Sequence, residues 1–168
     1  MQEPEVRRSM GWRLLATDDS WAAAIARVTL GGVVWAHGAQ KLLGWFGGHG
    51  PQWYAEGFSK FFGIPPLLTW GLMLTEAVGM LLLVAGFAGR LWAALAMLIM
   101  LGAIHFAHLR NGFYMNWYGD KRGEGFEYHL LALALCAVVL IMGSGAASVD
   151  RLLMRRTVTE PRESAKHA

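Results

Sequence analysis

A carboxylate inside a long apolar segment is the residue of this chain best suited to chemistry. Glu76 stands near the centre of segment 67–87, in which every other residue is uncharged. An ionisable side chain within a membrane-spanning helix costs about 2.5–3.5 kcal/mol, so such residues usually face the interior of a helical bundle and pair there. Glu76 is therefore expected to have a partner or a chemical task.

Three basic side chains share the first apolar segment, 21–43. A rise of about 1.5 Å per residue places Lys41 about 3 Å, His37 about 9 Å and Arg27 about 24 Å from the end at residue 43. All three fall within about 40° of one line along a helix. Arg27 is a candidate counter-ion of Glu76, across a depth gap of about 11 Å, whereas Lys41 is expected to extend toward the lipid head groups.

Three histidines lie near the ends of two further apolar segments. His105 and His108 are three residues apart near the end of segment 91–108, and His129 is close to the start of segment 128–146. Most of the polar set is therefore expected to converge on the external half of one bundle. As catalytic candidates we take Glu76, Arg27, His37 and His105, and as cofactor-binding candidates Lys41, His108, His129 and Trp45.

These residue types fit two kinds of ligand. Imidazoles can donate hydrogen bonds to the carbonyl oxygens of a quinone head group, and a buried carboxylate can relay protons. Imidazole and carboxylate also bind transition metals in other four-helix bundles, but the chain has neither a repeated Glu-x-x-His motif nor a zincin pattern, so no metal ligands are assigned. A purely structural pair of Arg27 and Glu76 is an equal alternative to a functional one.

The elements that must position this site are apolar helices. Hydrophobic residues make up 55% of the 168 residues and charged residues 16%, and four segments are each about long enough to cross a bilayer: 21–43, 67–87, 91–108 and 128–146. A soluble helical protein would need amphipathic periodicity, but parts of segments 67–87 and 91–108 are apolar on all sides. The prediction is an all-α, polytopic membrane protein with a four-transmembrane-helix bundle over residues 21–146.

The connections and tails complete this organisation. Residues 88–90 are expected to form a tight hairpin, and residues 55–62 of the aromatic first external loop a short helix in the membrane interface. Residues 1–20 and 147–168 are expected to be cytoplasmic tails, the second one frayed, and the first apolar segment is expected to be kept as an anchor rather than cleaved. The aromatic residues of both external loops are read as an interfacial belt rather than as ligand-stacking residues.

Charge and cysteine content argue against a nucleic-acid-binding protein and against a protein that uses its own disulfide. A net charge of +3 comes from basic residues at the tails and turns, so nucleic acid is not an expected partner. Nine basic residues fall on the side of the termini and five on the other side, which predicts that both termini are cytoplasmic. The single cysteine, Cys136, excludes an internal disulfide and a CxxC redox pair.

Several short segments, read in order, resemble the DoxX family of small bacterial integral membrane proteins. These residues are Ala26-Arg27-Val28, Gly38, Lys41, Leu42, Phe62-Gly63-Ile64-Pro65, Glu76, Gly79, Leu81-Leu82-Leu83, Gly86, Gly89, Arg90, His108, Gly112-Phe113, Gly143-Ser144-Gly145, Ser148 and Asp150. The resemblance implies a four-helix fold, multi-pass in the bacterial inner membrane. It also implies an association with oxidoreductase systems, in which relatives take part in thiosulfate oxidation with quinone as acceptor or in thiol and oxidative-stress complexes.

Three functions follow as hypotheses. The first is a membrane subunit of a quinone-linked or thiol- and sulfur-linked redox system, acting with membrane or soluble redox partners, because Cys136 alone cannot carry thiol chemistry. The second is a non-catalytic scaffold in the lipid bilayer that recruits soluble partners, and the third is a small-solute transporter. Glycines such as Gly31, Gly32, Gly71 and Gly79 permit close helix packing, either within the chain or in a homo-oligomer.

Overall fold

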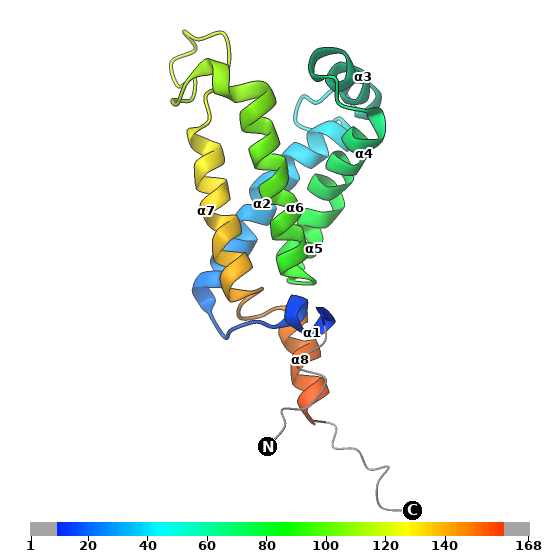
Figure 1. Ribbon diagram of the computed structural model, residues 1–168, viewed down its shortest axis with the longest axis vertical. Helices are drawn as coiled ribbons and strands as arrows, with labels where there is room; N and C mark the ends of the chain where they lie inside the picture. Colours follow the sequence, from blue (N-terminus) through cyan, green and yellow to red (C-terminus); the bar gives the residue numbers. More distant parts are fainter. Residues whose placement is uncertain (1–9, 160–168) are drawn as a thin grey trace, which may run out of the picture.

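The computed structural model describes residues 10–159, which consist of helices and the loops between them (Figure 1). The α-helices, in chain order, are α1 (Met10–Leu15), α2 (Trp21–Leu43), α3 (Pro51–Phe62), α4 (Pro66–Leu74), α5 (Met80–Ala85), α6 (Gly89–Ala103), α7 (Glu127–Met142) and α8 (Val149–Thr159). Two π-helical segments, η2 (Thr75–Gly79) and η3 (Ile104–His108), and a 3₁₀ turn, η4 (Leu109–Asn111), continue α4 and α6. The prediction of an all-α fold is confirmed over this range.

Within residues 10–159, two continuous helices are long and apolar enough to cross a membrane. Pro66–Ala85, formed by α4, η2 and α5, has 20 residues and a mean hydropathy of 1.9, and Gly89–Asn111 has 23 residues and a mean hydropathy of 1.8. Only 17% of the apolar window of the second helix is buried inside the protein. A core helix of a soluble protein would be mostly buried, so this exposure favours a lipid environment.

Helix α2 and helix α7 complete the bundle. Helix α2 has 23 residues; its N-terminus is capped by Ser20, whose Oγ accepts a hydrogen bond from the Ala23 N–H, and it ends at Gly44, whose φ is 70°. Helix α7 is apolar but has only 16 residues. The predicted segment 128–146 extends too far, because Gly143 has a φ of 81° and its N–H donates to Val139 at 2.8 Å, which ends α7 at Met142.

The core lies where α2, α5, α6 and α7 meet. Its buried residues are Leu30, Val34, Met80, Leu83, Ala93, Ala96, Met100, Ala132, Cys136 and Val139. Close contact between α2 and α5 depends on Gly31, because a Cβ there would lie 2.6 Å from a methyl group of Val84 and 2.9 Å from the Met80 carbonyl oxygen.

Figure 1 shows the two ends of the bundle as different structures, which we call the α3 end and the α8 end. Helix α3 and residues 112–126 form the α3 end. Helix α3 begins at Pro51 rather than at residue 55, since proline is favoured in the first turn of a helix. At the α8 end, α1 and α8 lie beneath the bundle, and the prediction of a frayed tail after residue 148 is wrong for residues 149–159, which form a helix. Residues 1–9 and 160–168 of the predicted tails lie outside the described range.

Candidate functional site

The central feature of the α3 end is a buried ion pair between α2 and η2. Lys41 Nζ lies 2.6 Å from Oε2 of Glu76. Glu76 is only 3% exposed, and the Lys41 side chain is 16% exposed. The same ammonium group donates to the carbonyl oxygen of His37 at 3.5 Å. Glu76 thus has the partner that its apolar surroundings require.

A π-helical turn and a glycine position this pair. Glu76 is the second residue of η2, and single π turns inside α-helices are frequent at functional sites. Helix α2 approaches η2 at Gly38, where a Cβ would lie 2.4 Å from both the Ala77 nitrogen and the Glu76 carbonyl carbon. The two backbones are therefore in direct contact three residues before Lys41.

This arrangement corrects the partners that the sequence suggested. Lys41 is the counter-ion of Glu76 and does not simply extend to the head groups, and Arg27 does not pair with Glu76. Gly38 is level with Glu76, and Arg27 lies eleven residues earlier, about 16 Å away along α2. The depth estimate failed because it assumed parallel helices, whereas α2 crosses the bundle obliquely behind α6 (Figure 1).

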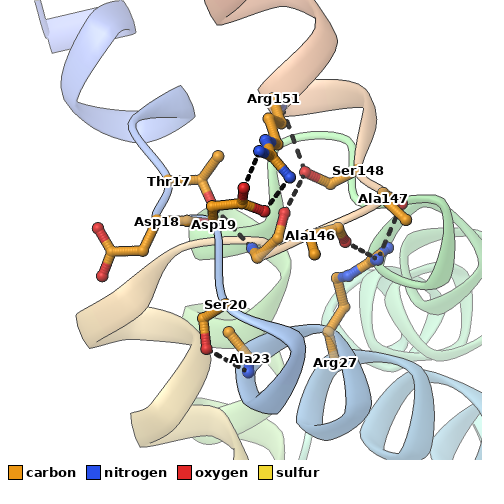
Figure 2. Close-up of polar contacts among 11 residues, drawn as sticks. Thr17, Asp18, Asp19, Ser20, Ala23, Arg27, Ala146, Ala147, Ser148 and Arg151 are labelled. Carbon is orange, nitrogen blue, oxygen red and sulfur yellow. Dashed lines mark hydrogen bonds and ion pairs between the residues drawn. The ribbon is translucent and has the colours of Figure 1, made fainter.

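Arg27 instead joins three segments at the α8 end (Figure 2). Its guanidinium donates to the carbonyl oxygens of Leu83 at 3.3 Å and of Val84, near the C-terminus of α5. It also donates to the carbonyl oxygens of Ala146 and Ala147, both at 3.2 Å. Arg27 is 2% exposed, so its guanidinium supplies buried hydrogen-bond donors to the end of α5 and to residues 146–147. The Leu83 carbonyl oxygen also accepts from the Gly86 N–H at 2.9 Å.

Asp150 accepts hydrogen bonds from backbone N–H groups at the N-terminus of α6. Its carboxylate accepts hydrogen bonds from the N–H groups of Ala88 at 2.8 Å and Gly89 at 3.0 Å, at the start of α6. It also accepts from the hydroxyl of Ser144 at 2.5 Å. A carboxylate at a helix N-terminus is favourable because of the exposed amides and the helix dipole. Neither Arg27 nor Asp150 is part of the site around Glu76.

A series of aromatic and imidazole rings lies near the Glu76 pair. The centroids of His37 and Tyr128 are 6.1 Å apart, those of Tyr128 and His129 are 5.3 Å apart, and those of His108 and His129 are 4.3 Å apart. His108 Nδ1 contacts the carbonyl oxygen of Glu124 at 2.9 Å. The structure thus brings together three of the predicted histidines from α2, η3 and α7.

Two buried polar atoms of this series, the Tyr128 hydroxyl and Nδ1 of His129, have no hydrogen-bond partner among the described residues. Buried polar groups are nearly always hydrogen-bonded, so each exception calls for an explanation. A bound ligand with hydrogen-bonding oxygens is one such explanation.

His105 and Trp45 lie apart from this series. The His105 ring packs against the adjacent Phe106 at 4.9 Å. Both His105 and His108 lie in η3, where the wider π turn changes the rotation per residue. The ring centroid of Trp45 lies 6.2 Å from that of Trp35 and 6.3 Å from that of Phe46.

Two tyrosines were not among the predicted site residues. Tyr128 follows directly after Glu127 at the start of α7. Burial, and then the negative charge of Glu76, raise the pKa of the phenol of Tyr54 in α3. Reading loop aromatics only as an interfacial belt concealed Tyr54, and Tyr128 lacked any sequence signal beyond its position beside His129.

The described residues contain no group of three or more His, Cys, Asp or Glu side chains that could hold a metal ion. The alternative of a metal centre therefore gains no support from this part of the chain.

Comparison with known proteins gives one match. A family model described as DoxX matches residues 22–109, which is more than half of the chain and includes Arg27, Lys41 and Glu76. No curated protein and no solved structure matches the chain.

Proposed function

We propose that this chain, which belongs to the DoxX family, is the membrane subunit of a redox system and binds a quinone head group beside Glu76 and Lys41. The observation that carries the proposal is the buried ion pair between these residues, with 2.6 Å between Lys41 Nζ and Glu76 Oε2. The Tyr128 hydroxyl and His129 Nδ1, in the nearby ring series, are buried without a hydrogen-bond partner among the described residues.

The residues present fit such a ligand. A quinone presents two carbonyl oxygens, and the Lys41 ammonium and the Tyr128 hydroxyl are hydrogen-bond donors for them. His129 Nδ1 is a further open position, donor or acceptor according to its tautomer. When bound, a quinone would supply the electron-accepting chemistry that this chain lacks, since its single cysteine, Cys136, is buried.

We assign the uptake and release of a proton to Glu76. Its carboxylate is held by Lys41, and movement of the lysine toward a ligand would leave the carboxylate free to take up or release a proton. We assign His37, His108 and His129 to a proton path between the ion pair and the surface of the α3 end. The centroids of neighbouring rings in this series, which includes Tyr128, are 4.3–6.1 Å apart. The catalytic role of His105 and the cofactor-binding role of Trp45 stay predictions.

The proposal includes a topology with four spans in the bacterial inner membrane and both termini in the cytoplasm. Helix α2 is long enough to span, and α7 would reach across only in a thinned bilayer or with its flanking loops. The α8 end carries Arg13, Arg90, Arg151, Arg155 and Arg156. The charge count that favours this orientation also includes Arg7, Arg8, Arg162 and Lys166, which lie outside the described residues.

A scaffold is the second candidate, and a specific observation favours it. Glu76 and Arg27 both have internal partners, so both can be read as residues that only fix helix packing. In that case soluble partners would carry all the chemistry.

One titration separates the two candidates. Decyl-ubiquinone is added to the purified protein in mild detergent, and quenching of tryptophan fluorescence reports binding. We expect saturable quenching in the natural protein and its loss in Glu76→Gln, whereas the control Asp120→Asn in an exposed loop behaves as the natural protein. Equal quenching of Glu76→Gln, or only non-saturable quenching of the natural protein, would favour the scaffold.

A further inference from the structure

An open groove lies between α3 and α4, on the outer side of the α3 end. Its volume is about 470 Å³, within the range of small-ligand sites. Ala55, buried at 7% exposure, is the small residue between its walls. Glu56, Ser59 and Lys60 of α3 line one wall, and Pro66 and Trp70 of α4 line the other.

The α3 wall carries one negative and one positive charge that do not neutralise each other. Glu56 and Lys60 are four residues apart, a spacing that commonly gives an ion pair on a helix. Among residues 10–159, however, no ion pair joins them, and Lys60 Nζ instead lies 5.8 Å from the ring centroid of Phe61. The groove therefore offers separate sites for an anion and a cation about one helical turn apart.

The α4 wall continues into an apolar surface. Below Trp70, which is 36% exposed, the same continuous helix exposes Leu74, Val78 and Leu81 at 48%, 49% and 50%. Trp70 at the polar end of this stripe is typical of a residue at the level of the lipid head groups. A ligand with a charged head and an apolar tail would match the groove and the stripe together.

We propose that this groove binds a phospholipid with a zwitterionic ethanolamine head group. The phosphate would lie against Lys60 and the hydroxyl of Ser59, the ammonium would donate to Glu56, and an acyl chain would follow Leu74, Val78 and Leu81. Charge complementarity selects this lipid. The choline head group has no N–H donor for Glu56, and a glycerol head group leaves a net negative lipid beside that carboxylate.

The test measures which lipids the protein retains. The full chain is reconstituted in nanodiscs with equal shares of phosphatidylethanolamine, phosphatidylglycerol and phosphatidylcholine, and native mass spectrometry identifies the lipids that remain bound. We expect the protein to retain about three times as much phosphatidylethanolamine as either of the other two lipids, as suits one exposed charge pair. The variant Glu56→Gln should abolish that enrichment.

A charge reversal at Glu56 predicts a change in lipid preference, which a variant that merely loses lipid binding would not show. Glu56→Lys places two cations in the groove and should transfer the preference to phosphatidylglycerol. Asp120→Lys, the same change in the exposed loop of the same end, should keep the preference for phosphatidylethanolamine, and circular dichroism checks that each variant is folded. Retention of lipids in their bulk proportions by the natural protein, or an unchanged preference in Glu56→Lys, would overturn the proposal.

Discussion

Lys41 of α2 and Glu76 of η2 are joined at 2.6 Å, one turn from the point where Gly38 touches the η2 backbone. The ion pair and the backbone contact therefore fix the same crossing of α2 over the continuous helix Pro66–Ala85. A buried charge that loses its partner is much more costly than a pair that is replaced as a whole. Changes at this crossing can separate the structural role of the pair from its proposed chemistry.

The two charges should depend on each other for stability. Glu76→Gln leaves the Lys41 ammonium without its counter-ion, and Lys41→Met leaves the carboxylate unpaired, so each is expected to lower the free energy of unfolding by about 3 kcal/mol. The double variant should lose less than the sum of the two. Unfolding in mixed micelles with increasing SDS measures all three, and strictly additive losses would contradict a coupled pair.

Gly38 should tolerate no side chain. A Cβ at this position would lie 2.4 Å from backbone atoms of Glu76 and Ala77, so Gly38→Ala must separate α2 from η2 and should lower the melting temperature and weaken decyl-ubiquinone binding. Gly32→Ala is the matched control, because nothing lies within 4 Å of a Cβ there and alanine favours a helix by about 1 kcal/mol. Similar melting temperatures for both variants would show that the crossing is looser than the structure indicates.

Arg27 should matter for stability and not for the site at the α3 end. Arg27→Lys cannot reach carbonyl oxygens on two segments with one ammonium group, and each buried acceptor left open costs about 1–3 kcal/mol. We expect a clear fall in melting temperature, with unchanged decyl-ubiquinone affinity of the folded protein at low temperature. Arg110→Lys, at an exposed position, is the control. Loss of affinity without loss of stability would return Arg27 to the binding site.

The apolar pattern predicted the helices well where local signals define them. Ser20 and Gly44 delimit α2, and its bounds coincide with segment 21–43. The pattern could not predict η2 and η3, because their residues are as apolar as a regular helix and the π turns arise with the packing around them. Nor could it reveal α8, whose first turn depends on Ser148, with its hydroxyl 3.3 Å from the Arg151 N–H.

The partner of Glu76 was harder to predict than the importance of Glu76 itself. Glu76 was recognised because its segment has no other charge, but choosing between Lys41 and Arg27 required the tilt of α2. Several residues on which the family resemblance rests lie together at the α8 end, in one hydrogen-bonded junction beside Arg27. They include Gly86, Gly89, Ser144 and Asp150. That junction explains why those types occur there: a Cβ at Gly89 would lie 2.1 Å from the Ser144 hydroxyl.

The proposed orientation can be tested with the chain's single cysteine. Cys136 is fully buried, so Cys136→Ala gives a cysteine-free protein at the cost of only a small cavity. Asp120→Cys in the loop 112–126 and Asp18→Cys beside α2 then place one exposed thiol at each end of the bundle. If both termini are cytoplasmic, a membrane-impermeant maleimide should label Asp120→Cys in intact cells and Asp18→Cys only after lysis. The reverse pattern would invert the topology and place Glu76 and Lys41 near the cytoplasm, where a quinone-linked reaction would exchange protons with the opposite compartment.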